Sequence, residues 1–336
     1  MVYGSDWPVN RPQPSRVVSD DAQDDMALPY TVEPLSLRGR VVRLGPAIDA
    51  ILKRHDYPAP IARVVGEAAA LTVLLGSALK HESSFQLQTR TNGPLDMLIV
   101  DFDAPANLRA LARFDPARLA QAAGARSGDL LGFGHLALTI DPGSEMSRHQ
   151  GIVSLEGQGL EDAAHQYFLR SEQIPTIVRL AVGQTVTPSG THWRAGGFLA
   201  QFLPESEDRR RQADFDPGDA PEGIAPDPFI EDDNWTEARA LVATIEDHEL
   251  LDPGVSSERL LYRLFHERGV KVFSPSPLRE VCRCSAERID AMLRSFTPAE
   301  RADMIGDDGT IGVTCEFCST KRVFDPADYR TSPVDE

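Results

Sequence analysis

Four cysteines constrain this chain more than any other feature of its sequence, because all of them lie in its last fifth and form two tight pairs. The first pair is Cys282-x-Cys284 and the second is Cys315-x-x-Cys318. Zinc–thiolate sites use closely spaced ligand pairs, since a tight turn lets both sulfurs reach one tetrahedral ion. The spacing therefore predicts that Cys282, Cys284, Cys315 and Cys318 bind one Zn²⁺ ion.

The residues around each pair predict the local structure that such a site needs. Segments 310–314 and 321–324 alternate as two strands on either side of the second pair, which is a zinc-hairpin pattern. Ser285 is placed to cap a helix directly after Cys284, and the positive end of that helix would favour the Cys284 thiolate. A capping box at Thr297-Pro298-Ala299-Glu300 predicts a second small helix.

The cysteine spacing alone leaves two interpretations of this site open. One is a structural zinc ribbon, and the other is a redox switch. A closed set of four thiolates leaves no position for a metal-bound water, which disfavours zinc hydrolase chemistry. Cys-x-Cys spacing suits a local disulfide that is readily reduced again. The tail has few large apolar residues, so loss of the metal would unfold it.

Charge and apolar patterning narrow the class of protein. The formal net charge of −17 disfavours a nucleic-acid binder, which depends on Lys and Arg to neutralise phosphates. No secretory signal is visible, and the most apolar run, residues 61–79, is interrupted by Arg63 and Glu67. We interpret that run as a buried core helix, and we expect a cytoplasmic protein without a membrane partner, whose thiols are kept reduced.

The composition divides the chain into four parts. Residues 1–31 are rich in Pro, Ser and Asp and predict a disordered N-terminal extension. Residues 32–204 predict an α+β domain, in which a mostly antiparallel sheet is covered by helices. Residues 205–275 form an acidic and then helical linker, and residues 276–331 form the small zinc-binding domain.

Periodicity predicts the elements of the α+β domain and of the linker. Helices are expected at 47–53, from Pro60 onward, and at 160–170, with strands at 85–89, 95–101, 108–114, 135–140, 149–155, 176–182 and 198–203. Two short amphipathic helices, at 234–245 and from Ser257 to about Phe265, follow in the linker. Because each is short, its stability must come from docking its apolar face, which makes this segment conditional structure.

Other candidate sites have ordinary structural interpretations. His55 is interpreted as a helix-boundary residue, since four thiolates already complete a zinc site. Gly196-Gly197 has no Gly-x-Gly-x-x-Gly context that would mark a phosphate loop. No Ser/His/Asp set can be justified from the sequence, so no catalytic residues are assigned and an enzyme is not expected.

Beyond the cysteines, several segments give the chain a resemblance to a known family. From about residue 31 to 331 the sequence resembles the 33-kDa heat-shock protein family of bacterial redox-regulated chaperones. The resemblance is carried by the cysteine spacing and by His55-Asp56-Tyr57-Pro58, Gln150-Gly151-Ile152-Val153, Leu155-Glu156-Gly157, Tyr167 to Thr176, Ala195-Gly196-Gly197-Phe198 and Leu261 to Glu267.

The resemblance implies a stress-response holdase that is inactive while reduced and zinc-bound. Oxidants would form the disulfides Cys282–Cys284 and Cys315–Cys318, release zinc, and unfold the tail and linker helices. The exposed surface would hold unfolding client proteins, and the oxidised form would be a homodimer. The extension to residue 30 and the acidic stretch at 205–233 go beyond the family pattern. The alternative is a zinc-ribbon nucleic-acid-binding protein, although the tail intersperses its Arg and Lys residues with acids.

Overall fold

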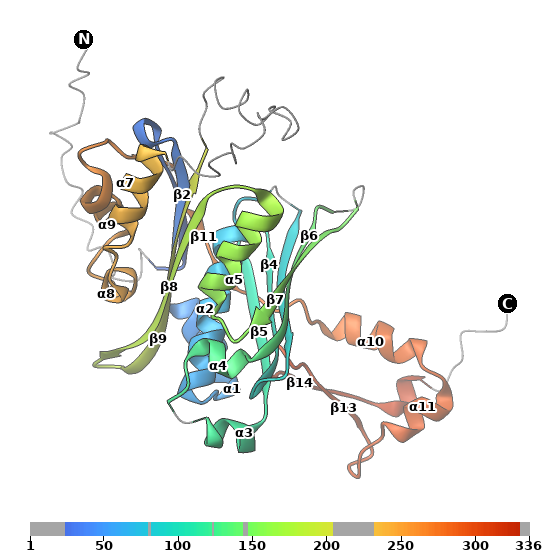
Figure 1. Cartoon of the computed structure of the whole chain (residues 1–336). Helices are drawn as coiled ribbons and strands as arrows, with labels where there is room; N and C mark the ends of the chain where they lie inside the picture. Colours follow the sequence, from blue (N-terminus) through green and yellow to red (C-terminus); the bar gives the residue numbers. More distant parts are fainter. Residues whose placement is uncertain (1–23, 80–81, 123, 144–146, 204–231, 330–336) are drawn as a thin grey trace, which may run out of the picture.

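The computed structural model describes residues 24–79, 82–122, 124–143, 147–203 and 232–329 (Figure 1). Residues 1–23 and 204–231 lie outside this part of the chain. Most of the predicted N-terminal extension and of the acidic stretch is therefore outside the described residues.

Within the described residues, the first sheet has the strand order β10-β1-β2-β9-β8, and β11 also pairs with β1. Every pairing in it is antiparallel. Ten consecutive residues of β9 are buried, because the sheet is covered on both faces. The strands are β1 (Met26–Val32), β2 (Leu37–Leu44), β8 (Thr176–Thr187), β9 (Gly190–Phe202), β10 (Lys271–Val272) and β11 (Ser276–Pro277).

The second sheet of the described chain has the order β12-β5-β4-β3-β6-β7. It is antiparallel except for β12, which adds to β5 in parallel. Buried and partly exposed residues alternate along β3 and β5, as expected where one face meets a core. The strands are β3 (Ser84–Thr91), β4 (Leu95–Asp103), β5 (Asn107–Phe114), β6 (Phe133–Asp141), β7 (His149–Glu156) and β12 (Arg279–Glu280).

Helix α2 (Ala59–Gly76) lies between the two sheets, with α1 (Pro46–His55) and α5 (Leu160–Tyr167) beside it (Figure 1). Its length and apolar composition would allow it to cross a membrane, but 72% of it is buried inside the protein. It is the predicted core helix. The shorter helices are α3 (Pro116–Gln121) and α4 (Ser127–Leu131), and α5 continues into a π-helical turn over Phe168–Glu172. We call the two sheets with these helices the core.

Three helices cover the outer face of the first sheet, on the side away from α2 (Figure 1). These linker helices are α7 (Asp233–Val242), α8 (Asp247–Leu251) and α9 (Ser257–Phe265). Their apolar side chains, among them Val242, Leu261 and Phe265, form one buried cluster with Tyr30 and Phe198 of the sheet. Tyr30 packs against both Phe198 and Phe265. The linker helices are therefore docked, as their amphipathic sequences require.

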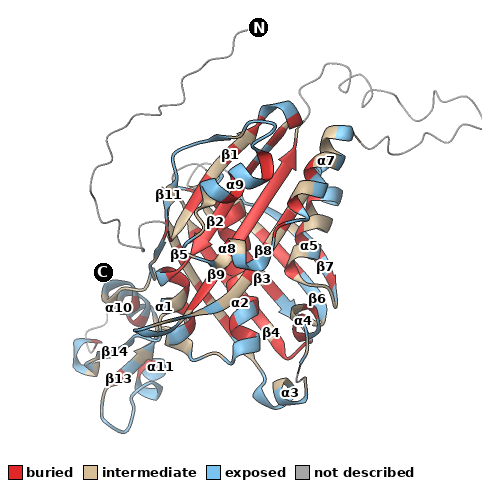
Figure 2. Ribbon diagram, turned by 90° about the vertical axis from the view of Figure 1, so that its left-hand side faces the viewer, coloured by how far each residue is buried: buried red, intermediate tan, exposed pale blue. Residues whose placement is uncertain are grey.

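The C-terminal unit, residues 282–329, projects from one edge of the core (Figure 1). Figure 2 shows that most of it is exposed. Its buried cluster contains Ile289, Leu293, Ile311 and Tyr329. It consists of α10 (Ala286–Ser295), α11 (Pro298–Asp303), the hairpin of β13 (Ile311–Thr314) and β14 (Lys321–Phe324), and a 3-10 turn over Pro326–Tyr329.

The α+β class with a mostly antiparallel architecture is confirmed, but its details differ from the prediction. The described part of the α+β domain has two sheets, not one, and β1 shows that the assignment of residues 26–31 to a disordered extension is wrong. Strands β1, β2 and β10 to β12 and helices α3, α4 and α8 were not predicted. The short ones have too few residues to show a period, and they exist because neighbouring strands and helices stabilise them.

Candidate metal centre

The β13–β14 hairpin carries the second cysteine pair in its turn. The Cys315 carbonyl accepts a hydrogen bond from the Ser319 N–H at 2.8 Å, and the Cys315 N–H donates to the Thr320 carbonyl at 3.1 Å. Ser319 has a positive φ of 53°, which closes the turn. This geometry brings the Cys315 and Cys318 sulfurs together and confirms the predicted hairpin.

The first pair lies between β12 and α10. Ser285 caps α10 as predicted, because its hydroxyl accepts a hydrogen bond from the Arg288 N–H at 3.2 Å. The predicted capping box between Thr297 and Glu300 is also present at the start of α11. The Ser285 cap fixes where α10 begins, and Cys284 lies directly before that cap.

All four predicted ligands meet at one point. Their sulfurs lie within 4.8 Å of one another. The Sγ atoms of Cys282 and Cys315 are 3.7 Å apart, and those of Cys284 and Cys318 are 3.3 Å apart. Zn–S bonds of about 2.3 Å at tetrahedral angles place sulfurs about 3.8 Å apart. The partly buried cluster therefore fits a tetrahedral zinc ion closely.

Sulfurs this close oppose one another's ionisation. Contact with Cys318, together with burial, raises the pKa of Cys284 to about 12. Burial also works against the Cys318 thiolate, but hydrogen bonds from Thr320 and the neighbouring thiols lower its pKa to about 6. Without a metal, the adjacent sulfurs disfavour the Cys284 thiolate, and the predicted effect of the helix terminus on that thiolate stays a prediction. A divalent cation would supply the charge that four thiolates need.

The core contacts the second pair through Phe317, one of the two residues between its cysteines. The Nε2 atom of His55 lies 2.9 Å from the carbonyl oxygen of Phe317. On β5, the guanidinium carbon of Arg109 lies 4.0 Å from the centre of the Phe317 ring. His55 is the last residue of α1, so its interpretation as a helix-boundary residue holds, but that interpretation missed its contact with Phe317.

Two arginines of the core also lie near the sulfurs. Pairing with Glu280 raises the pKa of Arg54, and thiolate charge at Cys318 and Cys282 adds to the effect. Burial works against the charged form of Arg109, but Asp101 and Cys282 together raise its pKa. Both guanidinium groups would therefore stabilise the negative charge of a four-thiolate site. Sequence spacing gave no sign of them, because they are more than 170 residues from Cys282.

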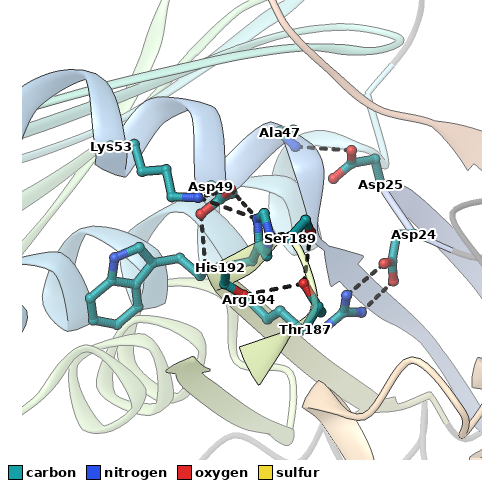
Figure 3. Close-up of polar contacts among 11 residues, drawn as sticks. Asp24, Asp25, Ala47, Asp49, Lys53, Thr187, Ser189, His192 and Arg194 are labelled. Atoms are coloured by element: carbon teal, nitrogen blue, oxygen red, sulfur yellow. Dashed lines mark hydrogen bonds and ion pairs between the residues drawn. The ribbon is translucent and has the colours of Figure 1, made fainter. Parts of the chain in front are cut away.

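A Ser–His–Asp arrangement that the sequence did not reveal lies at the β8–β9 hairpin (Figure 3). The Nε2 atom of His192 is 3.1 Å from the Ser189 hydroxyl, and Nδ1 is 2.8 Å from the Asp49 carboxylate. Lys53 also donates to that carboxylate at 2.8 Å, and Ser189 is exposed on the turn. A lysine that neutralises the aspartate weakens its support of an imidazolium. We therefore interpret the network as a tie between the hairpin and α1.

The chain matches known proteins over nearly its whole length. A family model described as Hsp33 protein matches residues 25–325. A 33 kDa chaperonin of Caulobacter vibrioides is 44% identical over 309 residues, covering 90% of this chain and 95% of that protein. A 33 kDa chaperonin of Ectopseudomonas mendocina is 34% identical, with 91% and 94% coverage.

A solved structure shares the fold. The 33 kDa chaperonin (heat shock protein 33 homolog) of Thermotoga maritima aligns with a TM-score of 0.70 and 19% identity, covering 91% of this chain and 96% of that one. The predicted resemblance is confirmed by the family match and by the identity to the curated relatives, and the names of those relatives support a chaperone role. This chain belongs to the Hsp33 family.

Proposed function

We propose that this protein is a redox-regulated holdase whose switch is the cluster of Cys282, Cys284, Cys315 and Cys318. The observation that carries the proposal is the closed four-sulfur cluster in a unit with a small buried core. When bound, Zn²⁺ would hold the four sulfurs as thiolates and cross-link the β13–β14 hairpin to the segment before α10. A unit stabilised in this way loses its fold when its ligands are oxidised.

The oxidation can be written with its electrons balanced. One thiolate attacks an oxygen of hydrogen peroxide, which gives a sulfenic acid and releases hydroxide. A second thiolate then displaces hydroxide from that sulfur, so two sulfurs lose two electrons and one peroxide becomes two waters after protonation. We propose the pairs Cys282–Cys284 and Cys315–Cys318, which follow the family resemblance. The closest sulfur contacts cross between the pairs, at 3.7 and 3.3 Å, so peptide mapping of the oxidised protein must decide the pairing.

The linker helices are the next element to respond. They join the core to the C-terminal unit, and their apolar faces cover apolar side chains of the first sheet. If they undock, both apolar surfaces become available to unfolding clients. We propose that this exposure is the active state, that the oxidised form dimerises, and that the protein acts in the cytoplasm. We also propose that the core, the linker and the zinc-binding domain divide at residues 204 and 275, with β1 (Met26–Val32) belonging to the core.

The test treats reduced, zinc-loaded protein with peroxide and mild heat. Zinc release is followed with a chromogenic chelator, and activity is followed as suppression of the aggregation of an unfolded client. We expect zinc release and activity to rise together, and Cys282→Ser and Cys315→Ser to lose this regulation. A protein that keeps its zinc, or loses it without gaining activity, contradicts the proposal. Ser295→Ala, at the end of α10, is the matched control.

A zinc-ribbon nucleic-acid binder fits the C-terminal unit less well. Arg283 pairs with Asp103, and Arg294 pairs with Asp290. Arg301 is buried and donates to main-chain carbonyls. These cations are engaged within the protein and do not form a free basic face.

A further inference from the structure

The motif His55-Asp56-Tyr57-Pro58 joins α1 to α2, and each of its residues has a distinct role. Asp56 takes a left-handed conformation that ends α1, and Pro58 precedes α2 as its N-cap residue. The Tyr57 hydroxyl accepts a hydrogen bond from the Ala112 N–H of β5 at 2.8 Å. The His55 ring stacks on Tyr57 with ring centres 4.9 Å apart. The motif therefore fixes the His55 ring beside β5, at the surface that the C-terminal unit contacts.

Phe317 meets this surface with both its main chain and its ring. Its carbonyl oxygen is 2.9 Å from Nε2 of His55, and its ring lies under the Arg109 guanidinium at 4.0 Å. Arg109 is itself held by the Asp101 carboxylate at 2.8 Å. Because Phe317 lies between Cys315 and Cys318, these contacts act on the turn that presents both sulfurs.

Other contacts bring the first cysteine pair to the same edge of the core. The Val281 N–H donates to the Leu108 carbonyl at 3.1 Å and thereby extends the β12–β5 pairing to the residue before Cys282. Arg54 forms a two-pronged ion pair with Glu280 at 2.6 and 3.0 Å. Arg283, between the cysteines of the first pair, pairs with Asp103. In both cysteine pairs, a residue adjacent in sequence to a cysteine therefore contacts the core.

We propose that His55, Tyr57 and Arg109 form a seat on the core for Phe317, and that occupancy of this seat sets how readily the cysteine cluster gives up its metal. The proposal rests on the proposed redox function for its role in the cell. Its physical content, the retention of a metal by contacts outside the ligand set, can be tested without oxidant. His55 is a positioning residue, since its ring contacts Phe317 and Tyr57, whereas Arg109 contacts both Phe317 and the ligand Cys282.

The reason is geometric. The metal is given up only when sulfurs leave the tetrahedral arrangement, whether by exchange or after oxidation, and opening of the turn between Cys315 and Cys318 allows their sulfurs to leave. Opening the turn moves Phe317 away from His55 and Arg109, so both contacts add to the barrier. Conversely, metal loss empties the seat, and the core then no longer holds the C-terminal unit by this contact.

The first experiment measures zinc transfer from reduced full-length protein to a competing chelator, without oxidant. His55→Ala and Phe317→Ala should each accelerate transfer about three- to tenfold, the effect of losing one hydrogen bond or one cation–π contact. The conservative variants Phe317→Tyr and Arg109→Lys should recover most of the wild-type rate. Phe317→Leu keeps most of the apolar volume of Phe317 but removes its aromatic ring. Fast zinc transfer from this variant as well would show that the effect of Phe317→Ala is not caused by a folding defect. The control is Arg90→Gln, an exposed arginine on β3 of the same sheet.

A double-variant comparison separates the seat from the ion pair between Arg109 and Asp101. Arg109→Gln should accelerate transfer in the wild-type background and less in Phe317→Ala, because the contact with the Phe317 ring is already gone there and the interaction of Arg109 with Cys282 is left to lose. Equal effects in both backgrounds, or His55→Ala and Phe317→Ala rates within twofold of Arg90→Gln, would overturn the proposal.

The same variants are then treated with limiting peroxide. If the variants release zinc faster than the wild type and gain anti-aggregation activity at less peroxide, the seat sets how much oxidant is needed for activation. If wild-type protein resists peroxide, the redox function fails while the chelator experiment still decides the seat. If the wild type responds to peroxide and the variants release zinc at the same rate as the wild type, the redox function is supported and the proposed role of the seat is contradicted.

Discussion

Glu67 is a carboxyl group placed among apolar residues of α2, the helix between the two sheets. Burial raises its pKa to about 7, although a hydrogen bond from the Ser127 hydroxyl at 2.9 Å partly opposes this. Glu161 and Asp247 add like charge that raises it further, and Arg63 lowers it. The sequence showed Glu67 only as an interruption of an apolar run. The free-energy cost of ionising Glu67 depends on neighbours that are distant in the chain.

The raised pKa of Glu67 predicts that the free energy of unfolding falls as pH rises. Its pKa is raised from 4.5 to about 7 on folding, so the folded state binds the proton more tightly than the unfolded state. The contribution of protonated Glu67 to the free energy of unfolding is intact below pH 4.5. It is lost as pH rises through about 7, and the loss is at most ~3 kcal/mol. Glu67→Gln should remove this loss and raise the urea midpoint at pH 8. The exposed Glu156→Gln is the control; an unchanged pH dependence in Glu67→Gln would contradict the assignment.

The cysteines show how much of a site can be predicted from single residues. Their spacing identified a common metal site, and the structure brings the four sulfurs within 4.8 Å. Spacing could not give their ionisation, because the pKa of Cys284 depends first on its contact with Cys318, which is 34 residues away in the chain. Ligand identity is a local property of the sequence, whereas pKa is a property of the assembled cluster.

Among the elements, helix α2 and strands β3 to β7 were predicted near their observed bounds, because their periods are clear. Strands β1 and β2 were missed although they have seven and eight residues, and β9 begins at Gly190, eight residues before the predicted strand at 198–203. Strands β10, β11 and β12 have two residues each. They are defined by pairing with β1 and β5, and no local pattern could reveal them.

The docking of the linker helices depends on Arg43 of β2. Its side chain is buried, and it donates to the carbonyls of Glu249, Leu250 and Asp252 at the end of α8 at 2.5 to 3.3 Å. It also donates to the Ser257 hydroxyl at the start of α9 at 3.2 Å. One residue of the first sheet therefore satisfies the polar groups that the α8–α9 turn would otherwise bury without partners.

Arg43→Met should loosen the linker helices in the reduced protein. It leaves buried carbonyls without a donor, at about 1–3 kcal/mol each, partly offset because a buried charge is also removed. We expect a net loss of docking stability of about 2 kcal/mol, seen as faster proteolysis within residues 232–266 and as anti-aggregation activity before oxidation. Arg259→Met, at an exposed position on α9, is the control. Equal proteolysis of the two variants would rule out this role for Arg43.

At the scale of the whole molecule, the predicted order of parts is recognisable, but their contacts were not foreseen. The sequence placed a linker and a zinc-binding tail after an α+β domain. It did not show that β12 adds to the second sheet or that α1 ends at the turn between Cys315 and Cys318. These contacts join residues up to 262 positions apart. A single sequence contains no information that pairs such positions, so the interface with the core could be seen only in three dimensions.

The division of the buried clusters predicts a partial response to metal removal. The C-terminal unit has its own small cluster around Leu293 and Ile311, whereas the core and the linker helices are stabilised by two larger ones. Chelation under reducing conditions should therefore unfold residues 282–329 and leave the core intact. By hydrogen exchange, the amides of β13 and α10 should lose protection while those of β3 and β4 keep it. Intact protection of β13 and α10 without metal would contradict a metal-dependent fold, and loss of protection in β3 would show that the two parts unfold together.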